Sequence, residues 1–346
     1  MKAFYIPDFH VINIGFNALN KSRDDLHAIY ESLGFTPLRK DIVTLNDEKI
    51  KYFASNRNVL GGYVKSLLQE RERKCSKGDY LFLDFPFAVK FAGYSKIVSY
   101  AKSRERKVVF FIHDLDGIRF RNPIRNWSDS SCLDRGDYRI SASEERDNVL
   151  YGQLNVSKKV KSVNYNYWDY LCADIPNRLR SALICFAGNL AKSGFLSQVP
   201  CSLTSSGFNL YGKGFQSNYK GTFCGEYDPE KLVSVLDGRF GLVWDGKSDK
   251  TCTGNFGKYL RINSSHKFGL YRASGKPVIV WKDGSLASFV MKKGIGIAVS
   301  SLKEIPSRIS QLDCYDYLRR TENIKPIRKD VITGSHLKKV ILSTRK

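Results

Sequence analysis

The sequence predicts an α/β fold of two domains, on three observations. Two apolar runs typical of buried parallel strands, Tyr80–Phe85 and Lys107–Ile112, flank a stretch of helical character at Val89–Ser103. The same alternation restarts at Ala182–Phe186 and continues through four further apolar runs. A chain of 346 residues is too long for one ordinary domain and long enough for two.

The remaining elements follow in chain order. The first half predicts strands at Phe4–Ile6 and Val11–Ile14, a helix at Ala18–Leu33, a strand at Tyr138–Ile140 and a helix at Ser141–Tyr151. We interpret residues 152–182 as the passage between the domains. The second half predicts strands near 207–211, 240–244, 277–281 and 294–299, and a helical, basic tail from about Ser310. The expected organisation is a first domain at 1–175, a second at 176–310 and a helical segment at 311–346.

The composition limits the classes of protein. Lys and Arg exceed Asp and Glu by 56 − 34 = 22, so the chain attracts anions such as nucleic acid, anionic lipid or a phosphorylated substrate. The basic residues are densest at 158–161 and from Arg319 to the C-terminus, and no nucleic-acid-binding motif accompanies them. We therefore expect no nucleic-acid partner. An anionic membrane surface and a generally basic, soluble surface both remain open.

The sequence also indicates a compartment. It contains no apolar run of membrane-spanning length, and its N-terminus has no continuous apolar segment with a cleavage site. The eight cysteines are scattered without a CxxC pair, which favours reduced thiols over disulfides or a zinc site. These features predict a cytoplasmic protein. If the basic surface binds an anionic membrane, the protein is peripheral at the inner face of the cell membrane.

The most informative stretch is Phe240–Val299, where a strand, a loop rich in glycine and hydroxyl groups, a helix and another strand follow one another. Asn263 is placed to cap the helix N-terminus, the two serines after it fill the first turn, and Gly275 is placed to end the helix. A helix N-terminus suits a phosphate, and Lys267 adds a full positive charge. The same arrangement also occurs in α/β proteins without any ligand.

Several blocks of sequence carry a resemblance. They are FGLVWDG (240–246), NSSHK (263–267), GLYRASGKPVIVW (269–281), GFNALNKSRDD (15–25), FLDFPFA (82–88), FFIHDLDGIR (110–119) and CFAGNLAKSGF (185–195). The chain resembles a group of bacterial glycosyltransferases that includes β-1,6-galactofuranosyltransferases of surface-polysaccharide synthesis and the glucosyltransferase of adhesin glycosylation. The resemblance implies the GT-B fold, with two Rossmann-like domains facing a central cleft, and a nucleoside-diphosphate sugar as donor.

The resemblance implies roles on the donor side. It places Gly188, Asn189, Lys192, Tyr211, Asn263 and Lys267 around the donor nucleotide. Lys192 stands where part of the family has an arginine, and a lysine cannot form the bidentate fork of a guanidinium. The alternatives are an ordinary surface lysine at 192 and a plain core tyrosine at 211.

On the acceptor side, the block HDLDG supplies His113, Asp114 and Asp116 as candidates for the general base. Its two carboxylates also resemble the metal motif of another glycosyltransferase fold, and a loop that satisfies its own hydrogen bonds is a third interpretation. The resemblance further implies that Gly15 and Asn17 face the substrates. Lys21 is placed to neutralise a phosphate on the acceptor, or to lie on a solvated helix face.

The sequence therefore predicts an inverting glycosyltransferase that uses a UDP-sugar, first of all UDP-galactofuranose, to extend a lipid-linked or polysaccharide acceptor without a metal or other cofactor. One alternative is transfer of glucose onto GlcNAc of a serine-rich adhesin, and another is a non-catalytic basic binding module. Hydrolase, P-loop and dinucleotide motifs are missing. The sequence leaves the oligomeric state open, a homo-oligomer included.

Overall fold

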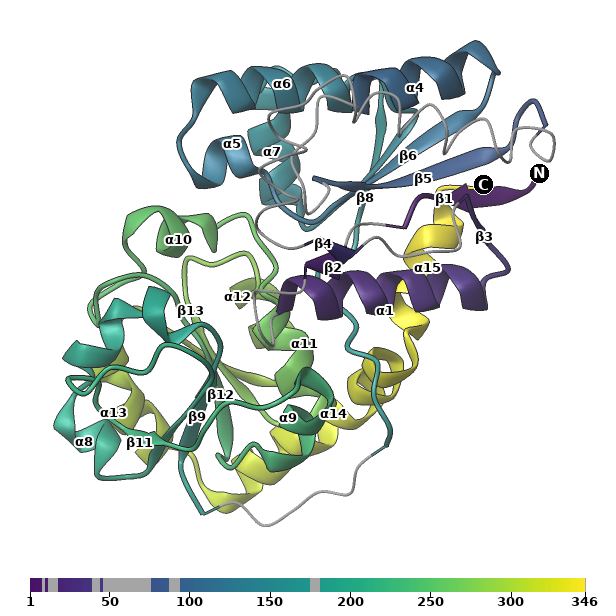
Figure 1. Cartoon of the computed structure of the whole chain (residues 1–346). Helices are drawn as coiled ribbons and strands as arrows, with labels where there is room; N and C mark the ends of the chain where they lie inside the picture. Colours follow the sequence, from purple (N-terminus) through teal and green to yellow (C-terminus); the bar gives the residue numbers. More distant parts are fainter. Residues whose placement is uncertain are drawn as a thin grey trace. The chain divides into compact units, whose positions relative to one another are not determined.

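The computed structural model describes residues 1–7, 10–11, 18–38, 44–45, 76–86, 94–174 and 181–345. The chain divides into two compact units (Figure 1), which are described separately. Unit 1 comprises residues 1–15, 19–165 and 337–346, and unit 2 comprises residues 16–18 and 166–336.

Unit 1 is built on a parallel sheet in the order β3-β1-β5-β6-β7-β8. Its strands are β1 (Ala3–Tyr5), β3 (Thr36–Pro37), β5 (Tyr80–Phe85), β6 (Lys107–Ile112), β7 (Tyr138–Ser141) and β8 (Lys161–Asn164), and β2 (His10–Val11) pairs separately with β4 (Thr44–Leu45). Its helices are α1 (Ala18–Ser32, of which Ala18 is assigned to unit 2), α4 (Tyr94–Ser103), α5 (Asp116–Arg119), α6 (Pro123–Leu133) and α7 (Glu144–Gly152). The α/β prediction is confirmed in this unit.

The apolar runs that predicted strands are the central ones. β5 is buried along its whole length, and β6 along all but its first residue, because helices cover both faces of a parallel sheet. Two larger differences from the prediction concern Ser141 and residues 152–182. Ser141 ends β7 instead of opening a helix, because Ser143 caps α7 by accepting a hydrogen bond from the Arg146 N–H. The expected passage at 152–182 contains the edge strand β8, whose polar, half-exposed side chains gave no apolar run.

Unit 2 contains a second parallel sheet, in the order β11-β10-β9-β12-β13-β14. Its strands are β9 (Ile184–Ala187), β10 (Phe208–Tyr211), β11 (Thr222–Phe223), β12 (Phe240–Val243), β13 (Val278–Trp281) and β14 (Gly296–Val299). Its helices are α8 (Cys201–Thr204), α9 (Pro229–Val235), α10 (Gly254–Tyr259), α11 (His266–Ala273), α12 (Ala287–Lys293), α13 (Ile305–Ser310) and α14 (Cys314–Thr333), with short 3₁₀ turns η3 (Leu190–Lys192), η4 (Gly194–Gln198) and η5 (Leu302–Glu304). The five strands predicted in this half are confirmed.

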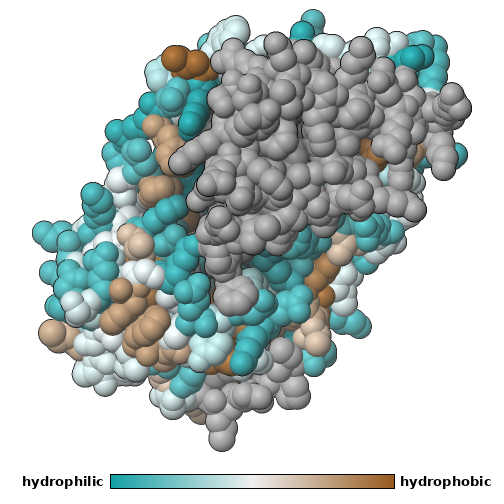
Figure 2. Space-filling view, in the orientation of Figure 1, coloured by the Kyte–Doolittle hydropathy of each residue, from teal (hydrophilic) through white to brown (hydrophobic). Residues whose placement is uncertain are grey.

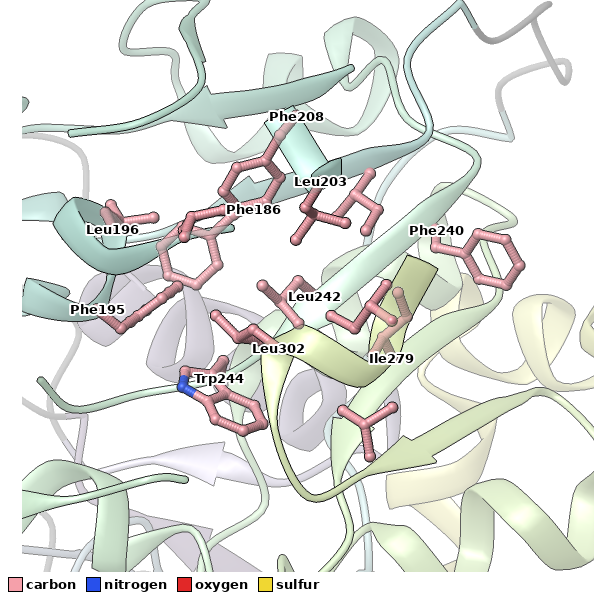
Figure 3. Packing of buried hydrophobic residues seen from close by; sticks show 14 of the residues in the cluster. Phe186, Phe195, Leu196, Leu203, Phe208, Phe240, Leu242, Trp244, Ile279 and Leu302 are labelled. Carbon is pink, nitrogen blue, oxygen red and sulfur yellow. The ribbon is translucent and has the colours of Figure 1, made fainter. Parts of the chain in front are cut away.

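A hydrophobic core fixes one face of the second sheet. Figure 3 shows Phe186 and Leu242 from neighbouring strands meeting Phe195, Leu203 and Leu302 from the turns and helix that cover them. All five side chains are fully buried. Burial of such side chains stabilises the fold by about 1.5–3 kcal/mol each, so this layer holds the strand ends in place.

The basic tail is helical, as predicted. α14 belongs to unit 2, where the Tyr170 N–H donates to the Val331 carbonyl. The next helix is α15 (Ser335–Ser343), and the chain from residue 337 onward belongs to unit 1. There the Arg345 guanidinium donates to the Met1 carbonyl. None of the helices in the described part of the chain is long and apolar enough to cross a membrane.

Candidate functional site

The second sheet reverses its strand order at β9. β10 lies on one side of β9 and β12 lies on the other. The chain therefore builds the sheet outward from β9 in one direction through β10 and β11, and in the opposite direction through β12, β13 and β14. β9 and β12 pair only through Ile184 with Phe240 and Cys185 with Gly241. Open α/β sheets bind ligands at the carboxyl ends of strands where the order reverses, so this edge is the first candidate for a site.

Tyr271 of α11 connects the two strands beyond the point where their pairing stops. Its hydroxyl accepts a hydrogen bond from the Ala187 N–H at 2.9 Å and donates one to the Leu242 carbonyl at 3.1 Å. Burial raises the pKa of Tyr271, which keeps the hydroxyl protonated as a donor. Gly241 makes room for the ring, because a Cβ at that position would overlap it.

The turn after β9 is tightly constrained. A Cβ on Gly212 would overlap the Gly188 carbonyl, so the turns that follow β9 and β10 touch through their glycine backbones. Asn189 comes next, and its side-chain Oδ1 is buried without a hydrogen-bond partner in the described structure. A buried acceptor in this condition is costly, and a ligand is one way to satisfy it.

Lys267 brings a positive charge to the same edge. Its ammonium donates to both oxygens of Asp245, at 2.9 and 3.0 Å, and lies 5.3 Å from the centre of the Phe186 ring. A Cβ on Gly188 would be 2.9 Å from the Lys267 Cε. The structure therefore brings together the predicted residues Gly188 and Lys267, and adds Asp245 just after β12.

The helix that carries Lys267 begins later than predicted. α11 starts at His266 with Ser265 as N-cap, so the assignment of Asn263 as N-cap is wrong. The Asn263 N–H donates to the Tyr259 carbonyl and closes the turn after α10, while its own carbonyl accepts from the Ser285 hydroxyl. Lys267 is thus in the first turn, where backbone N–H groups have no partner within the helix. The prediction that Gly275 follows the helix end in a left-handed conformation is confirmed by its φ of 67°.

Ser264, just before that N-cap, is a residue that the sequence analysis did not single out. Its side chain is buried, and no hydrogen-bond partner for its Oγ is present among the described residues. Its carbonyl accepts from the Trp168 indole N–H, which fixes the backbone that leads into α11. Two buried oxygens, Asn189 Oδ1 after β9 and Ser264 Oγ before α11, are therefore without a partner among the described residues and available to a ligand.

Lys192 is exposed, in the short turn η3 after β9. Its ammonium lies 5.1 Å from the centre of the Phe256 ring of α10. Both elements follow the carboxyl ends of their strands, so Lys192 belongs to the same edge of the sheet as Lys267. Its contact with a donor diphosphate stays a prediction.

Tyr211 is packed inside unit 2. The ring is buried, and the hydroxyl accepts from the Asp237 N–H at 2.9 Å while donating to the Val235 carbonyl at 3.4 Å. Burial raises the pKa of Tyr211. These contacts correspond to the core tyrosine that the sequence left open as an alternative, and stacking on a base stays a prediction.

In unit 1, His113 is buried beside Asp84 of β5. The Nε2 atoms of His27 and His113 lie 3.0 and 3.6 Å from the same oxygen, Asp84 Oδ2. Burial alone would raise the pKa of Asp84, but hydrogen bonds and charge from His113 and His27 outweigh it and hold this pKa well below its usual range. Both ring nitrogens of His113 are inaccessible to solvent in this arrangement.

The two carboxylates of HDLDG have different environments. Asp114 accepts from the Arg119 guanidinium at 2.8 Å and keeps a partly exposed side chain, whereas Asp116 is buried at the start of α5. The described ranges contain no group of three or more His, Cys, Asp or Glu residues that could hold a metal ion.

The remaining acceptor-side predictions fall on α1 and the residues before it. Lys21 is buried and its ammonium lies 2.7 Å from Asp25 Oδ1, so the alternative of a solvated helix face is wrong for this residue, while its contact with a phosphate of the acceptor stays a prediction. Asp25, one helical turn later, neutralises Lys21. Gly15 and Asn17 lie outside the described residues.

Comparisons with known proteins find relatives over most of the chain. Residues 9–160 match the family model of the glucosyltransferase 3-like N-terminal domain, and residues 184–344 match that of the corresponding C-terminal domain. The chain is 30% identical over 341 residues to the Escherichia coli (strain K12) β-1,6-galactofuranosyltransferase WbbI, covering 94% of this chain and 96% of that protein. It is 27% identical over 258 residues to glucosyltransferase 3 of Streptococcus gordonii, covering 71% and 72% of the two chains.

Solved structures show the same fold. The Anabaena HepE structure in complex with UDP and glucose matches with a TM-score of 0.61 at 14% identity over 99% of both chains. The UDP-forming α,α-trehalose-phosphate synthase of Burkholderia xenovorans, in complex with glucose-6-phosphate, matches with a TM-score of 0.60 at 9% identity over 100% of both chains. The fold of the chain is therefore GT-B, as predicted.

Proposed function

The chain belongs to the glucosyltransferase 3-like family of glycosyltransferases, and from this premise we propose that it transfers galactofuranose from UDP-galactofuranose to a hydroxyl of a growing surface glycan. The coarser activity, glycosyl transfer from a UDP-sugar, follows from the family. The choice of galactofuranose is supported by the 30% identity to WbbI over nearly the whole of both chains. The proposed acceptor is lipid-linked, so the enzyme would work at the anionic inner face of the membrane.

One observation carries the donor site. The Lys267 ammonium is held by Asp245 at the edge where β9 and β12 separate, and it belongs to the first turn of α11, where the partial positive charge of a helix N-terminus favours an anion. We propose that the donor diphosphate lies against this edge, with Lys192 as a second cation. These groups would stabilise the negative charge that develops on the departing UDP, so the reaction would need no metal.

The proposed reaction inverts the anomeric carbon. The acceptor oxygen forms a bond to that carbon while the bond to the diphosphate oxygen breaks and UDP leaves with the electron pair. A base takes the proton of the acceptor hydroxyl. Among His113, Asp114 and Asp116, Asp114 has the most exposed side chain, so we propose it for this role.

The test is turnover measured as UDP release, with UDP-galactofuranose and a lipid-linked glycan, in the presence and absence of EDTA. Lys267→Ala should lose most of the turnover while the protein stays folded, and Lys292→Ala, an exposed lysine of α12, should keep it. Asp114→Asn should lower kcat and leave UDP binding unchanged. Full turnover of Lys267→Ala would refute the donor site, and loss of turnover with EDTA would refute the metal-independent reaction.

A second candidate is transfer of glucose onto GlcNAc of a serine-rich adhesin, which the 27% identity to glucosyltransferase 3 favours. The same assay separates the two. UDP release from UDP-glucose with a GlcNAc-bearing serine-rich peptide, and none with the lipid-linked glycan, would select this candidate.

A further inference from the structure

The helices α5 and α6 of unit 1 expose a group of large apolar side chains. Ile124 is 79% exposed, Trp127 is 74% exposed and Phe120 is 43% exposed. In Figure 2 a strongly hydrophobic residue stands out among hydrophilic ones at the upper edge, over the part of unit 1 where Figure 1 shows α6. Such side chains are costly to expose to water, which makes this surface a candidate for binding.

The other tryptophans of the chain show how unusual this exposure is. Of the four in the sequence, Trp168, Trp244 and Trp281 are at most 4% exposed. Ile124 and Trp127 are three residues apart on α6 and therefore share one face of the helix. This face points away from the core of its own unit.

Arginines surround the apolar side chains. The guanidinium carbons of Arg119 and Arg125 lie 5.4 and 5.7 Å from the centre of the Phe120 ring, and Arg121 is exposed between the two helices. No Asp or Glu lies between Gly117 and Ser128 in the sequence. We call the six residues Arg119, Phe120, Arg121, Ile124, Arg125 and Trp127 the α5–α6 surface.

The two acids next to this stretch in the sequence both have partners. Asp114 accepts from Arg119 and neutralises that arginine, which leaves Arg121 and Arg125 as the charged groups of the surface, and Asp129 accepts from the Gly117 N–H at 3.2 Å. The backbone of the surface is also held in place, because Asn122 caps α6 and a Cβ on Gly117 would overlap Asn126. The surface is therefore ordered, positively charged and apolar at once.

We propose that the α5–α6 surface docks the enzyme on an anionic lipid bilayer. The headgroup layer of such a bilayer offers phosphates to the arginines, and the boundary with the acyl chains offers an apolar, partly hydrated environment that suits Trp and Phe. A protein partner would need an apolar pocket and acidic groups in a fixed arrangement, whereas a bilayer supplies both over any area. The inference rests on the proposed function only for its purpose, which is to bring a lipid-linked acceptor to the enzyme.

The test uses the full chain and vesicles of phosphatidylcholine, with and without phosphatidylglycerol. Because Trp127 alone of the four tryptophans is exposed, its fluorescence should shift to shorter wavelength and be quenched by lipids brominated in the acyl chain. Both effects should require phosphatidylglycerol and disappear at high salt. Vesicle binding with Trp127 still open to an aqueous quencher would overturn the proposal.

Paired variants separate the contributions to binding. Arg121→Gln with Arg125→Gln should weaken vesicle binding by about 25-fold, since each basic residue near an anionic surface contributes a factor of about five. Ile124→Ser with Trp127→Ser should weaken it by at least about ten-fold, because the apolar insertion is lost.

The matched control is Tyr315→Ser with Leu318→Ser on α14, where the two side chains are 78% and 54% exposed but Asp316 pairs with a neighbouring arginine. This control should bind vesicles like the wild type.

An equal loss of vesicle binding in the control and in the α5–α6 variants would overturn the proposal, and so would a dimer of the wild type that the α5–α6 variants dissociate. UDP binding, followed by thermal shift, should be unchanged in every variant. Failure of the vesicle result with intact UDP binding would reject the docking surface and leave the proposed function in place.

Discussion

Replacing Lys267 by Met tests how the candidate donor site holds a diphosphate. The change removes the proposed hydrogen bond from the Lys267 ammonium to the diphosphate, and a hydrogen bond between charged groups contributes about 1.5–3 kcal/mol to binding. It also removes the counter-ion of Asp245, whose carboxylate lies 2.9 Å from the ammonium in the wild type, so that this carboxylate faces the diphosphate alone. Two like charges about 5 Å apart near a protein surface repel by about 3 kcal/mol before screening by salt. We therefore expect Lys267→Met to weaken UDP binding by at least about 100-fold.

The double variant Lys267→Met with Asp245→Asn separates the two contributions. It lacks the ammonium but also lacks the uncompensated carboxylate, so it should bind UDP at least about ten-fold more tightly than Lys267→Met alone. Calorimetric titration with UDP measures both variants. Thermal unfolding checks the fold, and it should change little because a partly exposed ion pair contributes at most about 1 kcal/mol. UDP binding by Lys267→Met within about three-fold of wild type, or no recovery in the double variant, would refute this reasoning.

Three further variants test other parts of the structure. Tyr271→Phe removes the hydroxyl that pairs with the Ala187 N–H and the Leu242 carbonyl between β9 and β12, so the free energy of unfolding measured with urea should fall by about 2–4 kcal/mol. The control Tyr315→Phe, at an exposed position, should change the free energy of unfolding very little. Gly188→Ala places a Cβ against the Lys267 Cε, so UDP binding should weaken about ten-fold while the free energy of unfolding changes by less than about 1 kcal/mol; unchanged UDP binding would show that the lysine moves aside freely. Asp84→Asn should cost about 3 kcal/mol at neutral pH, because it removes the carboxylate that two histidines share. Folding lowers the pKa of Asp84, so the stabilisation from its carboxylate is present above about pH 4 and is lost as the pH falls below that value. The difference in free energy of unfolding between wild type and Asp84→Asn should therefore decrease at low pH. A difference that stays constant with pH would contradict the assignment.

The sequence predicted the fold best where burial left a plain pattern. β5 and β6 are buried on both faces, and their apolar runs gave both strands with the observed ends. β8 was not predicted, because an edge strand with half-exposed polar residues has no such run. The start of α11 was placed two residues early, because Asn263 has the chemistry of an N-cap but its backbone completes the turn after α10.

The candidate site was predictable only residue by residue. Family resemblance pointed to Gly188 and to Lys267, but their contact comes from the packing of α11 against β9 and β12. Tyr271 was missed because an apolar helix position gives no sign that its hydroxyl will bridge two strands. Asp245 stood in a recognised block, yet only the structure shows that it holds the Lys267 ammonium.

The central claim is that the edge of the second sheet binds a UDP-sugar through this lysine and the first turn of α11. A thermal-shift measurement of the full chain against UDP, GDP, CDP and TDP, each with and without EDTA, tests it most directly. The account predicts stabilisation by UDP alone, growing with UDP concentration as for a ligand bound to the folded state, and unaffected by EDTA. No stabilisation by any of the four nucleotides would contradict the donor-site assignment.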